Sequence, residues 1–162
     1  MSARTRILTV AVGVTVLVLT ATALATAPIG QTLNLLGRGS TGRLHAKHDG
    51  IVLKSRGPVD VAVATVTFAA NGGSSGWHHH PGVVLVVVQS GEVTFYDKKC
   101  RPEVHKAGET FVEAENAPGL AKNHGTVDAV VQATFIVPSS APPAPPTPLR
   151  IDDAQPKRCN VT

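Results

Sequence analysis

Alternation of apolar and polar residues dominates the chain after residue 50 and predicts half-buried β-strands. Val59–Phe68 alternates, with β-branched residues at every second position or closer, and 127–137 repeats the pattern. Val83–Val88 is instead a continuous apolar run, which predicts a strand buried on both faces. Glu92–Tyr96 follows the turn Gln89-Ser90-Gly91 and predicts the return strand of a hairpin.

Short strands separated by glycine-containing turns predict an all-β domain. Thr110–Val112 is a further short strand, and Asn71–Gly76 is a turn or loop cluster. No segment after Gly50 has a convincing helical period. The pattern fits a sandwich or a barrel and leaves these two open.

The N-terminus has the layout of a targeting segment. Arg4 and Arg6 precede the uncharged run Ile7–Gly37, whose small residues include Ala23-Leu24-Ala25. This order predicts a signal peptide within residues 1–27, cut after Ala25. The alternative is an uncut membrane anchor, because 7–29 is long enough to span a bilayer as an apolar helix. Both readings place the main domain outside the membrane, either secreted or anchored, with membrane contact only through this segment.

The exported part divides into three regions. Residues 28–50 are rich in Gly, Ser, Thr and basic residues, and predict a linker or a loosely packed arm. Residues 51–137 hold the β-domain. In residues 138–162, six of the eleven positions from Pro138 to Pro148 are proline, which predicts an extended strap followed by a tail.

Both cysteines of the chain, Cys100 and Cys159, lie in the exported part. An oxidising compartment favours a disulfide between them, which would tie the tail to the domain and contribute about 4 kcal/mol through chain entropy. Two separate thiols are the alternative reading.

Charge gives little support to nucleic-acid binding. Without residues 1–25 the chain has 13 Lys and Arg against 11 Asp and Glu, a net charge of +2. The basic residues are scattered along the sequence and aromatic residues are few, so no basic stripe is predicted.

The residues with the strongest chemical signal are the histidines of Gly76-Trp77-His78-His79-His80-Pro81-Gly82. In a strand, His78 and His80 share one face and His79 points the other way. Two imidazoles on the inner face of a barrel can bind one divalent metal, and imidazole suits Zn, Cu, Fe and Ni. A solvated strand end without any ligand is the alternative.

At these residues the sequence resembles the cupin family, over roughly 59–137. His78, His80 and Gly91 match the family's first motif, while Gly108 and Asn123 fall at the two ends of the second. The resemblance implies a single antiparallel, jelly-roll-like cupin β-barrel, preceded here by the N-terminal apolar helix. It leaves a homodimer open and does not imply one activity.

Two of the four usual ligands of that family are missing. Val84 stands where the family has a glutamate, and Gly119 where it has a histidine. His124 is a weak substitute because it lies one residue beyond Asn123. Other substitutes without positional support are His79, His105, Glu109 and Glu113.

Three functions remain open on the sequence alone. The first is an exported cupin that binds a small ligand, with a weakened or lost metal site and a pocket lined by Trp77, Val84, Val86, Gly119 and Asn123. The second is a metal-dependent oxygenase or isomerase with Mn, Fe, Ni, Cu or Zn bound by His78 and His80. The third is a structural or interaction protein of the cell envelope.

Overall fold

The computed structural model describes residues 24–140, 144 and 146–161. The segment predicted as a signal peptide or anchor lies almost wholly outside these residues. Within the described ranges, no helix has the length and apolar character needed to cross a membrane. The described residues form ten β-strands and no helix, which confirms the predicted all-β class.

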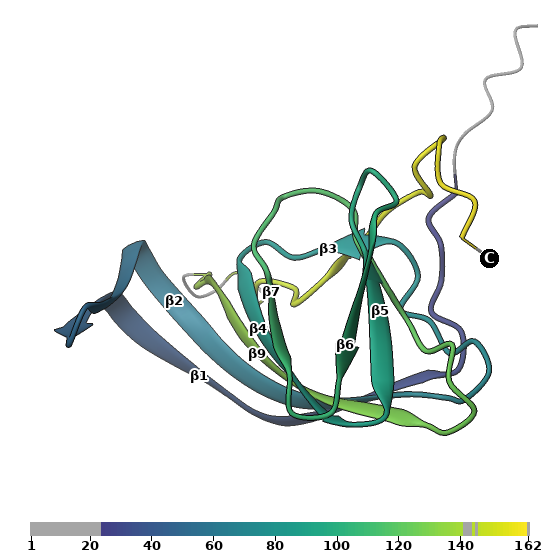
Figure 1. The fold of residues 1–162 in the computed structure, drawn as a ribbon. Helices are drawn as coiled ribbons and strands as arrows, with labels where there is room; N and C mark the ends of the chain where they lie inside the picture. The colour runs from purple at the N-terminus through teal and green to yellow at the C-terminus, as the bar shows by residue number, and fades with distance from the viewer. Residues whose placement is uncertain (1–23, 141–143, 145, 162) are drawn as a thin grey trace, which may run out of the picture.

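All strand pairs are antiparallel and form three sheets (Figure 1). The five-stranded sheet has, in spatial order, β1 (Gln31–His48), β2 (Ile51–Phe68), β9 (Ala129–Pro138), β4 (Val83–Ser90) and β7 (Thr110–Glu113). The three-stranded sheet has β6 (Pro102–Lys106), β5 (Glu92–Tyr96) and β8 (Leu120–Lys122). The third sheet pairs β10 (Ile151–Asp152) with β3 (His78–His79).

The core fills the barrel between the two larger sheets. Every second residue of β4, of β9 and of the second half of β2 points inward, because successive side chains of a strand alternate between its faces. These side chains meet Val93 and Ala121 of the three-stranded sheet in one cluster. The alternation predicted for 59–68 and 127–137 therefore decides which side chains form the core.

The prediction that Val83–Val88 is buried on both faces is wrong. Val84, Val86 and Val88 are buried, but Val83, Leu85 and Val87 are 38–44% exposed on the outer face of the sheet. No described element covers this face of β4. An apolar run shows that a strand is apolar on both sides, but only the packing decides which side is covered.

Residues 28–50, predicted to be a linker or a loosely packed arm, contain strand β1 (Gln31–His48). This strand pairs with β2 along its whole length, through the turn at Asp49 and Gly50, both of which have positive φ. The far part of this hairpin extends well beyond the barrel (Figure 1). Its residues are largely exposed, so the strand is held by main-chain pairing and gives no clear hydrophobic pattern in the sequence.

The hairpin gathers basic residues that are scattered along the sequence. Residues 37–57 contain five Lys and Arg against one acid, whereas the rest of the described chain has eight against ten. The two strands bring residues ten or more positions apart in the sequence onto one short arm. The arm is therefore cationic.

Asp60 anchors the base of this hairpin. Its carboxylate accepts hydrogen bonds from Ser139 Oγ, from Ser40 Oγ at 2.8 Å and from Arg38 Nε at 2.9 Å. These hydrogen bonds lower the pKa of Asp60 from 3.8 to about 2, and the one from Ser139 has the largest effect. The ionised carboxylate thus joins β2 to β1 and to the segment after β9.

The predicted disulfide between Cys100 and Cys159 is confirmed, with the two Cα atoms 5.4 Å apart. Cys159 packs with Trp77 and Leu120 in a second apolar cluster at the edge of the barrel. The tail after the proline-rich segment therefore returns to the domain and is covalently held there. Residues 141–143 and 145 of the proline-rich segment lie outside the described residues.

We predict that Asp60→Asn lowers the free energy of unfolding at neutral pH, because it removes the charge that Arg38, Ser40 and Ser139 stabilise. A carboxyl with a lowered folded-state pKa stabilises the fold above its unfolded pKa, and this stabilisation disappears as pH falls through the folded value. The difference between wild type and variant should therefore shrink from about pH 4 to about pH 2. Urea titrations at several pH values measure it.

Asp49→Asn is the control, since Asp49 is exposed at the far turn of the same hairpin. Its free energy of unfolding should stay close to that of the wild type. An Asp60→Asn protein as stable as the wild type at pH 7 would contradict the anchoring role.

Candidate metal centre

His78 lies in the short strand β3 and His80 directly follows this strand, with the two imidazole rings side by side. Both are buried, with 6% and 8% of their surface exposed. His79 points away from this pair, and its Nδ1 lies 2.7 Å from Asp153 Oδ2. Because side chains alternate along an extended segment, the imidazoles of His78 and His80 lie on one face and that of His79 lies on the opposite face.

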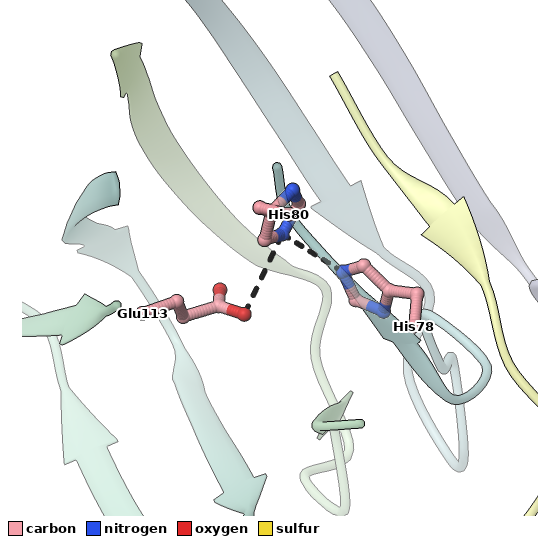
Figure 2. A group of neighbouring side chains, drawn as sticks. All are labelled: His78, His80 and Glu113. Carbon is pink, nitrogen blue, oxygen red and sulfur yellow. Dashed lines mark hydrogen bonds and ion pairs between the residues drawn. The ribbon is translucent and has the colours of Figure 1, made fainter. Parts of the chain in front are cut away.

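A carboxylate from β7 completes the cluster (Figure 2). The Nε2 atoms of His78 and His80 are 3.1 Å apart, and Glu113 Oε2 lies 3.5 Å from His80 Nε2. One ligand atom from each of the three residues lies within 4.8 Å of the others. Among the described residues, this is the only group of three or more His, Cys, Asp or Glu side chains so placed.

Hydrogen bonds to the main chain fix the protonation of both rings. His78 Nδ1 lies 2.9 Å from the Gly76 carbonyl oxygen, and His80 Nδ1 lies 2.5 Å from that of Leu149. A carbonyl oxygen can only accept, so each Nδ1 must carry a proton and donate it. In the neutral rings the two Nε2 lone pairs then face each other across 3.1 Å, next to a carboxylate.

Such an arrangement calls for a cation between the donors. Two facing lone pairs and a carboxylate repel one another unless a proton or a metal ion lies between them. Ligands bound to one metal at about 2.0–2.1 Å lie about 3 Å apart, so the distances of 3.1 Å between the two Nε2 atoms and 3.5 Å between His80 and Glu113 are close to those around a shared ion. The main-chain acceptors on both Nδ1 atoms are the outer contacts that metal-binding histidines usually have.

The electrostatics keep His78 neutral. Burial lowers its pKa from 6.5 to about 4, and the neighbouring His80 and Arg150 act in the same direction, while Glu113 opposes the shift. A metal binds the neutral imidazole, so this ring is ready to act as a ligand at neutral pH without releasing a proton.

Glu113 takes the place of the carboxylate that Val84 lacks. In the register of β4 and β7, Val84 lies directly opposite Glu113. Opposite residues of an antiparallel pair share a face, with Cβ atoms about 4.5–5.5 Å apart. The carboxylate therefore comes from the neighbouring strand at the same level of the barrel, and Val84 fills the core beside it.

Gly119 leaves no room for a ligand in its place. Its main chain exchanges two hydrogen bonds with His78, of 3.0 and 2.8 Å, and so holds the ligand strand. A Cβ atom at Gly119 would lie 2.6 Å from the Phe95 ring. The missing histidine of the second motif therefore cannot be restored here without moving Phe95.

The cluster separates two cavities of different size. On the inner side, a cavity of about 60 Å³ is lined by core residues that include Val84, Val86 and Phe135. On the outer side, a cleft of about 470 Å³ is lined by all three histidines, Glu113 and Phe95. The inner cavity is too small for an organic ligand, whereas the outer cleft is of the size that small-molecule sites have.

Three predicted site residues lie elsewhere. His124 is exposed, and its Nε2 lies 2.9 Å from the Tyr96 hydroxyl. Trp77 is 1% exposed and packs with Leu120 and Cys159, so it lines neither cavity. Asn123 is fully buried, and its side-chain amide bonds main-chain groups of the surrounding loops. It therefore organises those loops and does not line the pocket by the histidines.

Of the other substitutes considered from the sequence, only Glu113 joins the pair. His105 is buried and stacks on Phe111, with ring centroids 4.4 Å apart. Glu109 accepts a hydrogen bond from the main-chain N–H of Lys106 in a turn. A signal for Glu113 existed, since it follows the inward-facing Phe111 by two residues, but the β4–β7 register was needed to use it.

Comparisons with known proteins find similarity to solved structures. No protein-family model and no curated protein matches the chain. Among solved structures, it is similar to an oxalate oxidase in complex with the substrate analogue glycolate, at 27% identity and a TM-score of 0.42, over 46% of this chain and 40% of that one. The chain spans about two fifths of the length of that protein.

Two further similar structures are described as cupin domains. One is a cupin 2 conserved barrel domain protein from Leptotrichia buccalis, with 24% identity, a TM-score of 0.42 and coverage of 62% and 41%. The other is the cupin_2 domain of an XRE family transcriptional regulator from Enterobacter cloacae, with 13% identity, a TM-score of 0.46 and coverage of 69% and 100%.

We predict that Gly119→Ala lowers the free energy of unfolding by about 1–3 kcal/mol, the usual cost of overpacking. The added methyl group meets the Phe95 ring. Gly57→Ala is the matched control, because a Cβ there has nothing within 4 Å. Urea titration of both variants tests this, and equal stability of the two would refute the steric account.

Proposed function

We propose that this protein is a metal-dependent enzyme of the cupin class that acts on a small polar molecule. His78, His80 and Glu113 bind one divalent transition metal, and the substrate binds over it in the outer cleft. The observation that carries the proposal is the convergence of two Nε2 lone pairs and a carboxylate, with both Nδ1 protons already engaged. The cupin motif around His78 and His80 supports it independently.

The ligand set has the character of a catalytic site. Three protein ligands leave coordination positions for water or substrate, whereas structural sites are closed by four. Two imidazoles and one carboxylate are also the ligand set of non-haem Fe(II) oxygenases. Once bound, the metal would supply a Lewis acid or an oxygen-activating centre.

The chain's own residues would bind and orient the substrate. The cleft has apolar side chains such as Phe95 and Val112, together with Lys98 and Arg101. Lys98 Nζ lies 3.1 Å from Glu115, and Arg101 is paired with Asp97. The cleft therefore offers apolar contacts together with charged groups that can form hydrogen bonds, and the paired carboxylates offset the charge of the two cations. Such a lining suits a small polar molecule. On its inner side the apolar core shields the ligands from bulk water.

The second candidate is a ligand-binding protein in which a proton takes the place of the metal. The 3.5 Å distance between His80 and Glu113 favours it, since a protonated His80 would form an ion pair with that carboxylate. In both cases we propose that the domain works outside the cytoplasm, a location that the Cys100–Cys159 disulfide supports.

We predict that the purified wild-type protein binds one divalent ion per chain and that Glu113→Gln weakens this affinity more than about 100-fold. Loss of an outer contact alone costs 10–100-fold, and here a charged ligand is removed. The measurement is isothermal titration with Mn(II), Fe(II), Ni(II), Cu(II) and Zn(II) in turn, followed by metal analysis.

Glu115→Gln is the matched control, because Glu115 lines the same cleft but is not part of the cluster. Its affinity should stay within about twofold of the wild-type value. A wild-type protein that binds none of the five metals would overturn the metal-dependent function and favour the second candidate.

A further inference from the structure

The C-terminal segment Leu149–Asp153 lies against the metal cluster. The Leu149 carbonyl oxygen accepts the hydrogen bond from His80 Nδ1 at 2.5 Å. The Leu149 side chain packs against the core and lines the inner cavity behind the cluster. One residue of the tail thus touches both the ligand and the space next to it.

The rest of the segment is hydrogen-bonded to the strand that carries the two histidines. β10 pairs with β3, placing Ile151 opposite His79 and Asp152 opposite His78. Asp153 N donates to the Trp77 carbonyl oxygen at 2.9 Å, and Asp153 Oδ2 lies 2.7 Å from His79 Nδ1.

One further contact fixes the segment from the other side. Arg150 Nη2 donates to the Ser75 carbonyl oxygen at 3.0 Å. Residues before and within the segment 78–80 are therefore bonded to the tail.

These hydrogen bonds alone would bind the segment only weakly to β3. β10 has two residues, both exposed, and two-stranded pairs of this kind are marginally stable in water. Six residues further on, Cys159 is buried against Trp77 and Leu120 and is bonded to Cys100. The disulfide therefore restricts the tail to the neighbourhood of β3, where its hydrogen bonds can form.

We propose that Leu149 is a positioning residue of the metal site and that the Cys100–Cys159 disulfide controls the site's metal affinity by holding Leu149 in place. The inference rests on the proposed metal centre. When the Leu149 carbonyl is held against the ring, the proton of His80 stays on Nδ1 and Nε2 is free to bind. When the tail is released, neutral His80 exchanges between its two tautomers, and the one with a proton on Nε2 cannot bind the metal.

The two histidines should respond differently, which separates positioning from general loss of structure. The acceptor for His78 Nδ1 is the Gly76 carbonyl, two residues away on the same segment. The acceptor for His80 lies 69 residues away on the tail. Of the two Nδ1 acceptors, release of the tail therefore removes only that of His80.

The test compares the oxidised wild-type protein with two variants that loosen the tail. Cys100→Ser/Cys159→Ser removes the disulfide, and Arg150→Ala/Asp153→Asn keeps it but removes side-chain contacts of the segment. The control, Lys157→Ala/Arg158→Ala, changes two exposed residues of the same tail. Zn(II) affinity is measured by titration, and the ring tautomers of the metal-free protein by ¹H–¹⁵N NMR.

We expect the disulfide variant to bind Zn(II) about 10–100-fold more weakly, the usual effect of losing an outer contact of a ligand. We expect the contact variant to change in the same direction, by several fold. His80 should shift from the Nδ1–H form to a mixture, while His78 keeps its Nδ1–H signal. The control should match the wild type.

Unchanged Zn(II) affinity together with an unchanged His80 tautomer in both loosened variants would overturn the inference. If the disulfide variant does not fold, the contact variant alone decides. If the wild type binds no Zn(II) and none of the other metals, the proposed function fails. The NMR comparison still decides whether the tail orients His80, so the two failures can be told apart.

Discussion

Each of two buried imidazoles donates its Nδ1 proton to a main-chain carbonyl, and the chemistry of the site depends on this pair of hydrogen bonds. They leave both Nε2 atoms as acceptors at close range, with Glu113 beside them. A buried cluster of this kind is unfavourable without a cation, because burial weakens the solvation of the two lone pairs and the carboxylate. The three side chains are therefore arranged as a candidate site for a cation.

The barrel places a carboxylate beside the two histidines although position 84 is a valine, because the register offers another position on the same face. Val84 and Glu113 lie opposite each other on β4 and β7 and share the inner face. A carboxylate at position 113 can therefore occupy nearly the same region as one at position 84. At position 119 no such exchange occurs, since Phe95 takes up the space that a side chain would need. The result is a cluster of three side chains able to act as metal ligands beside an open cleft, an arrangement suited to the proposed function.

The tail links the chemistry of the site to the oxidation state of the chain. Its hydrogen bonds reach Trp77, His79 and His80, and the Cys100–Cys159 disulfide links it covalently to the domain near its end. A segment with such a short strand contributes little to the core, yet it supplies the acceptor that sets the tautomer of one ligand. The stability of the domain therefore depends mainly on the core between the two larger sheets, whereas the proposed site also depends on a peripheral tail segment.

The sequence by itself determined the all-β class, the inner and outer faces of 59–68 and 127–137, and the common face of His78 and His80. Each of these follows from the period-2 alternation of strands, a local property that needs no knowledge of neighbours. The tertiary structure alone decided what depends on pairing between distant segments. The register put Glu113 beside the histidines, and cross-strand pairing made a strand of 31–48, where the residues give no pattern because both faces are exposed.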